Sequence, residues 1–282
     1  MNRLLRAKAD IQAKRVDAGP GTRWMTPIWR RLESVGGFIV VIAVWQLAQQ
    51  ASGLPSTLFP SSLDALHALV DLYQVGILYE YTLLSLSHYL LGLGLGAGIG
   101  LALGLLISSN RRVSDILMPL VNFTYAIVEV AWIPLLILWW GYSPATIVVA
   151  VAYVVASPLV HNIVTGVRSI PPVYIRAVRA LGGDRRVVLT EVILPAIVPS
   201  LFNGLRVGAG FGFRALIFSE MISQSEGIGY LIFTSAASQQ TARTVAGMIV
   251  MGALWLFLDR MYLRPLERMS TYRWGLSSEA EK

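Results

Sequence analysis

The chain has 282 residues, of which 55% are hydrophobic and only 14% are charged. Soluble domains are about a quarter charged, so this composition excludes an ordinary soluble protein and indicates an integral membrane protein. The net charge of +7 does not indicate nucleic-acid binding, because the basic residues lie at the ends of apolar segments, where they set membrane topology. The lack of cysteine excludes disulfides and thiol chemistry.

Residues 1–34 form a basic arm ahead of the first apolar segment. Arg and Lys are frequent in this arm, and Gly19-Pro20-Gly21 interrupts its thin apolar stripe. A polar stretch of about thirty residues before the apolar segment is not the layout of a cleavable signal peptide. Two interpretations stay open: the arm lies on an anionic membrane leaflet, or it is a partly disordered cytoplasmic tail.

Apolar segments of spanning length then follow, judged against the roughly 20 residues that cross a hydrocarbon core. The third contains Pro119 and Pro134, so we expect it to be kinked or broken. Ser143-Pro144 is typical of a helix start and opens the fourth. The predicted fold is therefore an all-α polytopic membrane protein, with a membrane domain over 35–263 and a tail over 264–282. Its six segments cover 35–51, 81–107, 116–140, 144–166, 199–222 and 244–262.

The connections between these segments alternate in charge. Residues 52–79 and 141–143 contain no Lys or Arg, and 223–243 contain only Arg243, at the end. Basic residues gather instead in the other connections and at both ends of the chain. Because positive loops stay on the cytoplasmic side, both termini and the long loop at about 168–195 are predicted to be cytoplasmic. The basic connections are 1–34, Arg111-Arg112, 168–191 and 264–282.

Glycines recur every four residues in the second segment, at Gly92, Gly96, Gly100 and Gly104, with Gly94 and Gly98 as a second row. Small residues at this spacing let helix backbones approach closely in lipid. We interpret these glycines as a helix-packing face that carries no chemistry.

Catalytic motifs are missing from the sequence. The lysines are Lys8, Lys14 and Lys282, and none follows a glycine-rich loop, so the chain has no Walker A phosphate cradle. The histidines are scattered singly, without the spacing of a metal site, and no G-x-S-x-G motif occurs. We therefore expect no catalytic residue, no metal site and no cofactor.

The long loop contains two short helical patterns. Tyr174, Val178 and Leu181 fall at i, i+4 and i+7, which predicts a short helix with one apolar face. Gly182-Gly183 ends this helix, and Asp184 can cap a second one. From these residues alone the knob is either a docking surface for a cytoplasmic partner or an amphipathic helix on the bilayer surface.

This loop resembles the EAA loop in the permease subunits of ABC importers, whose pattern is E-A-A, three residues, G, and then an I-x-L-P motif. The resemblance covers nearly all of 35–274 and is closest to the branch that serves nitrate, taurine, aliphatic sulfonates, bicarbonate and related solutes. In the loop, Ala177, Gly182, Ile193, Leu194 and Pro195 match. Elsewhere the matching residues are Ala131–Leu135, Gly141, Gly166–Ser169, Gly204–Arg206, Glu220, Gly227–Leu231 and Leu258–Arg260.

The resemblance implies a type I importer permease in a bacterial plasma membrane, with no cofactor of its own. Its partners would be two ABC ATPase subunits, an extracytoplasmic substrate-binding protein, a second copy of the chain and membrane lipid, but no nucleic acid. The first glutamate of the pattern is Arg176 here, which implies an acidic residue on the ATPase or a rim position. The residues implied in ATPase coupling are Tyr174, Arg176, Ala177, Val178, Leu181, Gly182, Gly183 and Asp184.

Two charges lie inside predicted spans, Glu129 in the third and Arg214 in the fifth. Ionisable groups at membrane depth tend to face a cavity or each other. Three interpretations stay open: they form an ion pair, Arg214 meets an anionic substrate in the translocation path, or one of them lies near an interface. Outside, Glu226, Gly227 and Gly229 are candidates for contact with the binding protein.

The predicted function is ATP-driven import of a small anionic solute, with ATP hydrolysis in a partner subunit. The same importer class with a neutral or cationic vitamin precursor is an alternative. An ion-coupled secondary transporter would use Glu129, Arg214 and His161 as its coupling site, although no inverted repeat is detectable. A non-transporting membrane scaffold is the other rival, and neither rival explains the ordered matches in the loop.

Overall fold

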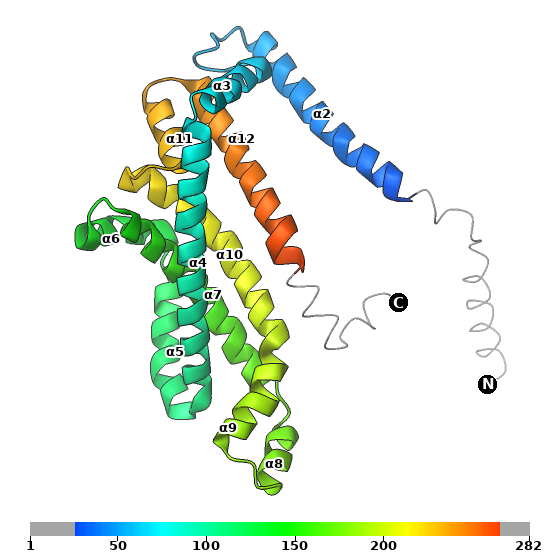
Figure 1. Ribbon diagram of the computed structural model, residues 1–282, viewed down its shortest axis with the longest axis vertical. Helices are drawn as coiled ribbons and strands as arrows, with labels where there is room; N and C mark the ends of the chain where they lie inside the picture. The colour runs from blue at the N-terminus through cyan, green and yellow to red at the C-terminus, as the bar shows by residue number, and fades with distance from the viewer. Residues whose placement is uncertain (1–25, 266–282) are drawn as a thin grey trace, which may run out of the picture.

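The computed structural model describes residues 26–265, and the surroundings of side chains from residue 36 onward. Within this range the protein is helical and contains no strand. Figure 1 shows an elongated bundle from which α2 leans away at one end. The helices are α2 Thr26–Ser52, α3 Ser62–Gln74, α4 Ile77–Ser109, α5 Arg111–Ala126, η1 Glu129–Trp132, α6 Ile133–Trp140, α7 Pro144–Arg168, α8 Pro172–Ala180, α9 Arg185–Val187, η2 Val188–Ile193, α10 Leu194–Ser223, α11 Ile228–Ala237, α12 Thr241–Leu258 and η3 Asp259–Leu263.

Four continuous helical stretches of the described chain are long and apolar enough to cross a membrane. They are α4, α7, the stretch Arg185–Ser223 and the stretch Thr241–Leu263. The pair α5 and η1–α6 counts as a fifth span if it is taken as one, and the apolar part of α2, Gly36–Ser52, is shorter. The predicted all-α membrane fold is confirmed. The N-terminal arm mostly lies outside the described residues, as do residues 266–282 of the tail.

The third predicted span is broken, as expected, and its two parts meet at an angle of 96°. The break falls at residues 127–128, between the two prolines, and not at either of them. Pro119 is accommodated inside α5. Pro134 lies in the first turn of α6, where a missing backbone N–H removes no helical hydrogen bond.

The fifth span begins earlier than predicted. We expected it to start at Pro199, but one helical stretch of 39 residues runs from Arg185 to Ser223 and includes both Pro195 and Pro199. A π-helical turn, Val188–Ile193, precedes Pro195, which occupies the first turn of α10. Because that turn already departs from the α-helical hydrogen-bond pattern, the proline does not end the helix.

The short connection before α3 is anchored by a capping box. The Ser61 hydroxyl accepts a hydrogen bond from the backbone N–H of Asp64, and the Asp64 carboxylate accepts one from the backbone N–H of Ser61. The hydrogen bonds that Ser61 donates to the Asp64 carboxylate keep the pKa of Asp64 below its usual value, and the bond from the Ser61 backbone N–H has the largest effect. The indole N–H of Trp45 donates to the carbonyl of Pro60 at 3.1 Å, which joins the outer part of α2 to this connection.

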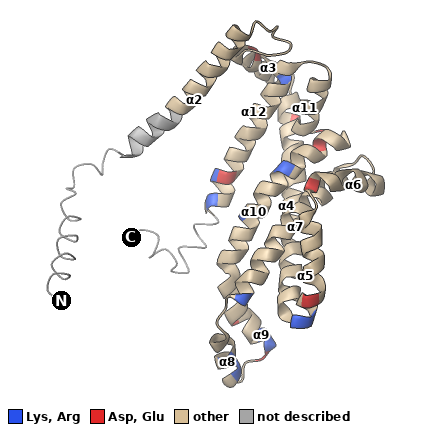
Figure 2. Cartoon of the chain, turned by 180° about the vertical axis from the view of Figure 1, so that it is seen from behind, with Lys and Arg blue, Asp and Glu red and all other residues tan. Residues whose placement is uncertain are grey.

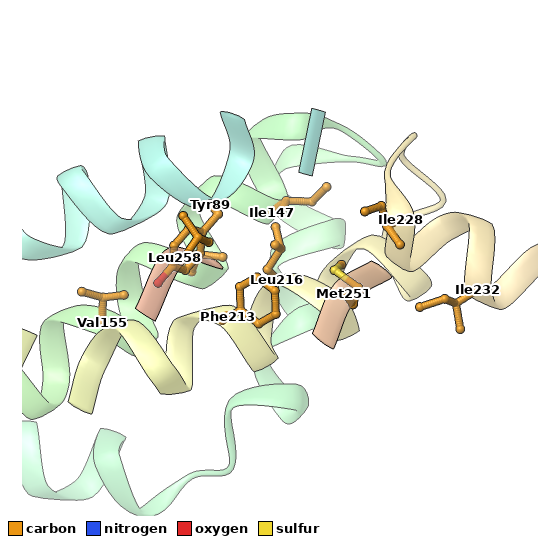
Figure 3. Packing of buried hydrophobic residues seen from close by; sticks show 10 residues of the cluster. Tyr89, Ile147, Val155, Phe213, Leu216, Ile228, Ile232, Met251 and Leu258 are labelled. Atoms are coloured by element: carbon orange, nitrogen blue, oxygen red, sulfur yellow. The ribbon is translucent and has the colours of Figure 1, made fainter. Parts of the chain in front are cut away.

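α7 lies at the centre of the bundle, between α4 and α10. Its residues Ile147, Val151, Val155, Leu159 and Ile163 recur every four positions and are fully buried. Figure 3 shows part of this core, in which α7 residues meet aromatic and aliphatic side chains from α4, α10, α11 and α12. The bundle is thus organised around one buried helix.

The predicted glycine face of α4 is confirmed for the row Gly92, Gly96, Gly100 and Gly104, which faces α7. A Cβ at Gly96 would lie 2.5 Å from the carbonyl oxygen of Ala152. The second row does not share this role, because Gly94 and Gly98 have no atom within 4 Å of such a Cβ. Sequence analysis missed a matching row on α10, at Gly204, Gly208 and Gly212, which faces the other side of α7.

Gly96→Ala should destabilise the bundle, because the new Cβ would also lie 2.8 Å from the Cβ of Val155 and would push α4 away from α7. We expect a loss of about 1–3 kcal/mol, the usual cost of overpacking. The measurement is the temperature at which the detergent-solubilised protein loses its monodisperse peak in size-exclusion chromatography. Gly98→Ala, on the same helix in open space, is the control, and equal midpoints for the two variants would contradict this packing.

Candidate functional site

The loop between α7 and α10 protrudes from one end of the bundle, where it forms α8 and α9 (Figure 1). α8 begins at Pro172 and ends before Gly182, which has a left-handed φ of 84°. The Asp184 carboxylate caps α9 by accepting a hydrogen bond from the backbone N–H of Val187 at 2.9 Å. The predicted order of short helix, glycine turn and capped second helix is therefore confirmed.

The apolar side chains of this knob are exposed. Leu181 is 88% exposed and Tyr174 is 59% exposed, and no residue of α8 is buried. Val178 differs from the predicted face, because it turns toward the glycine turn: a Cβ at Gly183 would lie 2.5 Å from its Cγ1. The exposed apolar surface is therefore centred on Tyr174 and Leu181, with Val178 supporting the turn from inside.

Basic residues surround this exposed surface. Arg176 and Arg179 on α8 and Arg185 and Arg186 on α9 are all exposed. Figure 2 shows Lys and Arg at this end of the bundle, around α8, α9 and the start of α5. A surface of this kind can bury its apolar centre against a partner while its charges form the rim of the contact.

Glu129 lines a cavity of about 250 Å³ at the break between α5 and η1. Tyr125, Tyr153 and Phe211 contribute aromatic walls, and Tyr153 Oη, on α7, donates to the carbonyl of Thr124, near the end of α5, at 2.6 Å. The hydroxyl of Ser157, which also lines the cavity, is buried without a hydrogen-bond partner. Buried polar atoms are normally paired, so this hydroxyl is available to a bound water or solute.

Arg214 lies on a different surface of α10. Its guanidinium is placed over the ring of Phe211, 4.9 Å from the centroid, and it lines a second cavity of about 560 Å³ between α10 and α12. No ion pair joins it to Glu129 in the part of the chain that the structure describes, so the ion-pair interpretation is wrong. Phe211 nevertheless contacts both regions, since it forms a wall of the Glu129 cavity and its ring lies under the Arg214 guanidinium.

His161 is not brought into direct contact with these charges. Its Nδ1 lies 2.9 Å from the carbonyl oxygen of Ser157 and its Nε2 lies 2.8 Å from Oδ1 of Asn122. The contact with Asn122 joins α7 to α5. The three residues that a secondary transporter would use therefore do not form one cluster.

The loop between α10 and α11 is organised around Glu220, whose role was not predicted. Glu220 is fully buried and contacts Ser85, His88 and the backbone N–H of Gly229. Gly227 and Gly229 are buried against it, and Glu226 is the exposed member of the predicted binding-protein contact. The signal available in the sequence was the glycine pair that follows an acidic residue at the end of an apolar segment.

Comparisons with known proteins agree with this architecture. The family described as "Binding-protein-dependent transport system inner membrane component" matches residues 94–269. The taurine transport system permease protein TauC of Escherichia coli K12 is 27% identical over 255 residues, which cover 88% of this chain and 92% of that protein. The bicarbonate transport system permease protein CmpB of Synechococcus elongatus is 28% identical over 247 residues, covering 84% and 89%.

A solved structure, that of an amino acid ABC transporter with histidines, has the same fold. It superposes with a TM-score of 0.56 at 16% identity, covering 72% of this chain and 97% of that one. The predicted family and branch are confirmed by these similarities.

The Glu129 cavity can be tested with a cysteine at its wall, since the native chain has none. Thr124→Cys should react with a small methanethiosulfonate reagent, because this partly exposed position lines the cavity. Ile163→Cys, in the buried core of α7, should react at least about tenfold more slowly, since thiol reactivity requires access. Equal rates for the two variants, measured by intact-protein mass spectrometry, would show that no accessible cavity exists.

Proposed function

Because the chain belongs to the family of binding-protein-dependent transport system inner membrane components, we propose that it is the permease subunit of an ATP-driven importer. The exposed α8–α9 knob is the observation that carries the proposal. Its apolar centre at Leu181 has no cover in the described chain, and its rim is basic. We assign this knob, residues about 168–195, to the cytoplasmic side, where it docks in a groove of an ATPase subunit.

The complete importer has two ATPase subunits, an external binding protein and a second copy of this chain. The family description itself supports the dependence on a binding protein. The position of α2 supports a second copy or lipid as neighbour, because α2 leans away from the bundle and large apolar residues such as Phe38, Val41 and Leu47 are exposed on it (Figure 1). The membrane domain spans 35–263, and the arm and the tail are cytoplasmic.

The transported solute is small and anionic in this proposal. The names of the relatives support this class, since taurine carries a sulfonate and bicarbonate is an anion. Arg214 is an exposed cation at membrane depth and would meet such a group in the translocation path. It lies one helical turn from Phe211, so an anion beside Arg214 would be next to the wall of the Glu129 cavity.

One observation favours the alternative solute class. The Glu129 cavity is lined by a carboxylate and aromatic side chains, and no Lys or Arg of the described chain lines it. A cationic or neutral nitrogen heterocycle would suit that surface, because aromatic faces attract cations and the carboxylate accepts N–H donors.

The first test is to purify the tagged chain from its native membrane in mild detergent and identify what accompanies it. A stoichiometric subunit with a Walker A motif is expected, and Leu181→Asp should remove it. A hot-spot residue contributes at least about 2 kcal/mol to binding, which is roughly a thirtyfold change in affinity. Leu58→Asp, an equally drastic change at an exposed leucine outside the knob, should leave the subunit bound.

Recovery of the chain alone, in a gentler detergent as well, would contradict the docking role and place the secondary transporter first. In the same assay Arg176→Glu separates the two explanations for this departure from the family pattern. Loss of the ATPase subunit would indicate an acidic partner residue, and its retention would indicate a rim position.

Arg214→Gln should abolish the ATPase stimulation caused by taurine, bicarbonate or nitrate, each of which has an anionic group, with the binding protein present, and leave basal hydrolysis unchanged. The reason is that Arg214 would meet the solute but does not contact the ATPase. The assay uses the purified complex in lipid nanodiscs. Arg243→Gln, an exposed arginine that donates to Gln240 at the start of α12, is the control. Equal loss of basal and stimulated activity would assign Arg214 a structural role.

A further inference from the structure

Three helices meet at a buried polar junction near the outer end of the bundle. We call it the Glu220 junction, and it consists of Ser85 and His88 from α4, Glu220 from α10, and Ile228 and Gly229 from α11. Glu220 Oε2 accepts hydrogen bonds from the Ser85 hydroxyl and from the backbone N–H of Gly229, both at 2.9 Å. Its Oε1 lies 3.3 Å from Nδ1 of His88.

The junction supplies the N-terminal cap that α11 lacks. Gly227, at the N-cap position, has no side chain to offer. The first two backbone N–H groups of the helix are paired instead with other helices: that of Ile228 with the Ser85 hydroxyl at 2.9 Å and that of Gly229 with Glu220. The carboxylate therefore also faces the positive end of the α11 dipole.

Glycine is required at two positions for this approach. A Cβ at Gly227 would lie 2.5 Å from the Glu220 carboxylate carbon, and a Cβ at Gly229 would lie 2.7 Å from the carbonyl oxygen of Ile217. The spacing of Glu220, Gly227 and Gly229 in the sequence is thus explained by contact between a carboxylate and a helix start. Any side chain at either glycine would separate α11 from α10.

The partners of Glu220 are divided between two neighbouring helices. Ser85 and His88 belong to α4, and the Gly229 N–H belongs to α11, while Glu220 itself ends α10. Moving α11 away would leave two backbone donors, those of Ile228 and Gly229, without partners and would remove one hydrogen bond from a buried carboxylate. Because a half-satisfied buried network is less stable than a complete one, the junction opens or closes as a unit.

The same helix that carries Glu220 begins at the knob. The helical stretch Arg185–Ser223 is continuous over 39 residues, which corresponds to a length of about 58 Å at 1.5 Å per residue. Figure 1 shows α10 running from the α8–α9 end of the molecule toward the end that carries α11. Movement of the knob is therefore transmitted along α10 to the Glu220 junction.

We propose that Glu220 is a positioning residue that couples α10 to the outer helix α11, so that movement of the knob changes the position of the outer loop. This coupling rests on the proposed function, in which ATP binding by a partner subunit moves the knob. Glu226 lies in the loop between α10 and α11, so the surface offered to the binding protein depends on the state of the junction.

A buried cysteine can report the state of the junction. Ser223 is fully buried, with an exposed fraction of 0%, and its hydroxyl has no hydrogen-bond partner. Because the native chain has no cysteine, Ser223→Cys introduces a single, nearly isosteric reporter thiol. Maleimide labelling should be slow with Glu220 present, about tenfold faster with Glu220→Gln, and faster still with Glu220→Leu. Ser56→Cys, in the exposed outer connection, should label equally in all three backgrounds.

The coupling itself is tested in the complex with its co-purified ATPase subunit. Adding ATP with orthovanadate should change the Ser223→Cys labelling rate at least about threefold in the Glu220 background, and should have no effect with Glu220→Gln. Basal ATP hydrolysis should be the same in both. A purely structural role for Glu220 would leave the nucleotide response intact, or would lower basal hydrolysis as well, and either result overturns the proposal.

Failure of the importer function gives a different result. In that case nucleotide would change labelling in neither background, although the Glu220 variants would still label faster. Gly229→Ala disturbs the junction from α11 and keeps the Glu220 charge. It should also make labelling of Ser223→Cys faster and abolish the response of labelling to nucleotide. Gly98→Ala, in open space on α4, is its matched control. Slow labelling in Glu220→Gln, Glu220→Leu and Gly229→Ala alike would show that Glu220 does not hold α11.

Discussion

The close approach of α4 and α10 to opposite sides of α7 is the constraint on which the rest of the structure depends. Val155 illustrates it, because a Cβ at Gly96 on α4 would lie 2.8 Å from its Cβ, and one at Gly208 on α10 would lie 2.8 Å from its carbonyl oxygen. In lipid, apolar side chains gain little by leaving their surroundings, so helices associate through close van der Waals packing of small residues. This contact sets the spacing between α4 and α10, and so decides which of their polar groups meet.

Polar groups at membrane depth are used in two ways. Glu220 and His88 are buried and paired, and they join helices that are distant in the sequence. Glu129 and Ser157 line a cavity, and the serine hydroxyl is unpaired. Desolvated charges are costly, so a paired carboxylate indicates a joint between helices, whereas unpaired polar atoms beside a cavity indicate a place for water or solute.

The fold class, the broken third span and the glycine face of α4 could be predicted from the sequence, because each depends on a local pattern of apolar residues, prolines or glycines. The site was predicted only in part. The α8–α9 knob follows from short-range periodicity and turn residues, but the inward turn of Val178 depends on its packing against Gly183. The Glu220 junction joins residues about 135 positions apart, as Ser85 and Glu220 show, and no local pattern indicates such a pairing.

The ion-pair interpretation of Glu129 and Arg214 failed for a related reason. Two opposite charges in neighbouring spans suggest an ion pair, but the side on which each residue projects depends on helix rotation and on the bend at residues 127–128. The start of α10 was misplaced because proline normally ends a helix, and the π-helical turn before Pro195 was not visible in the sequence.

The π-helical turn, Val188–Ile193, affects the direction in which the α8–α9 knob faces. A π-turn holds one more residue than an α-turn, so it changes the angular register between the chain before it and the helix after it. One residue corresponds to about 100° of rotation around an α-helix. The direction in which Tyr174 and Leu181 face, relative to the core side of α10, is therefore set by the number of residues in this turn. Val188, the first residue of the turn, is buried, and an insertion or deletion in the turn would rotate the knob away from its present direction.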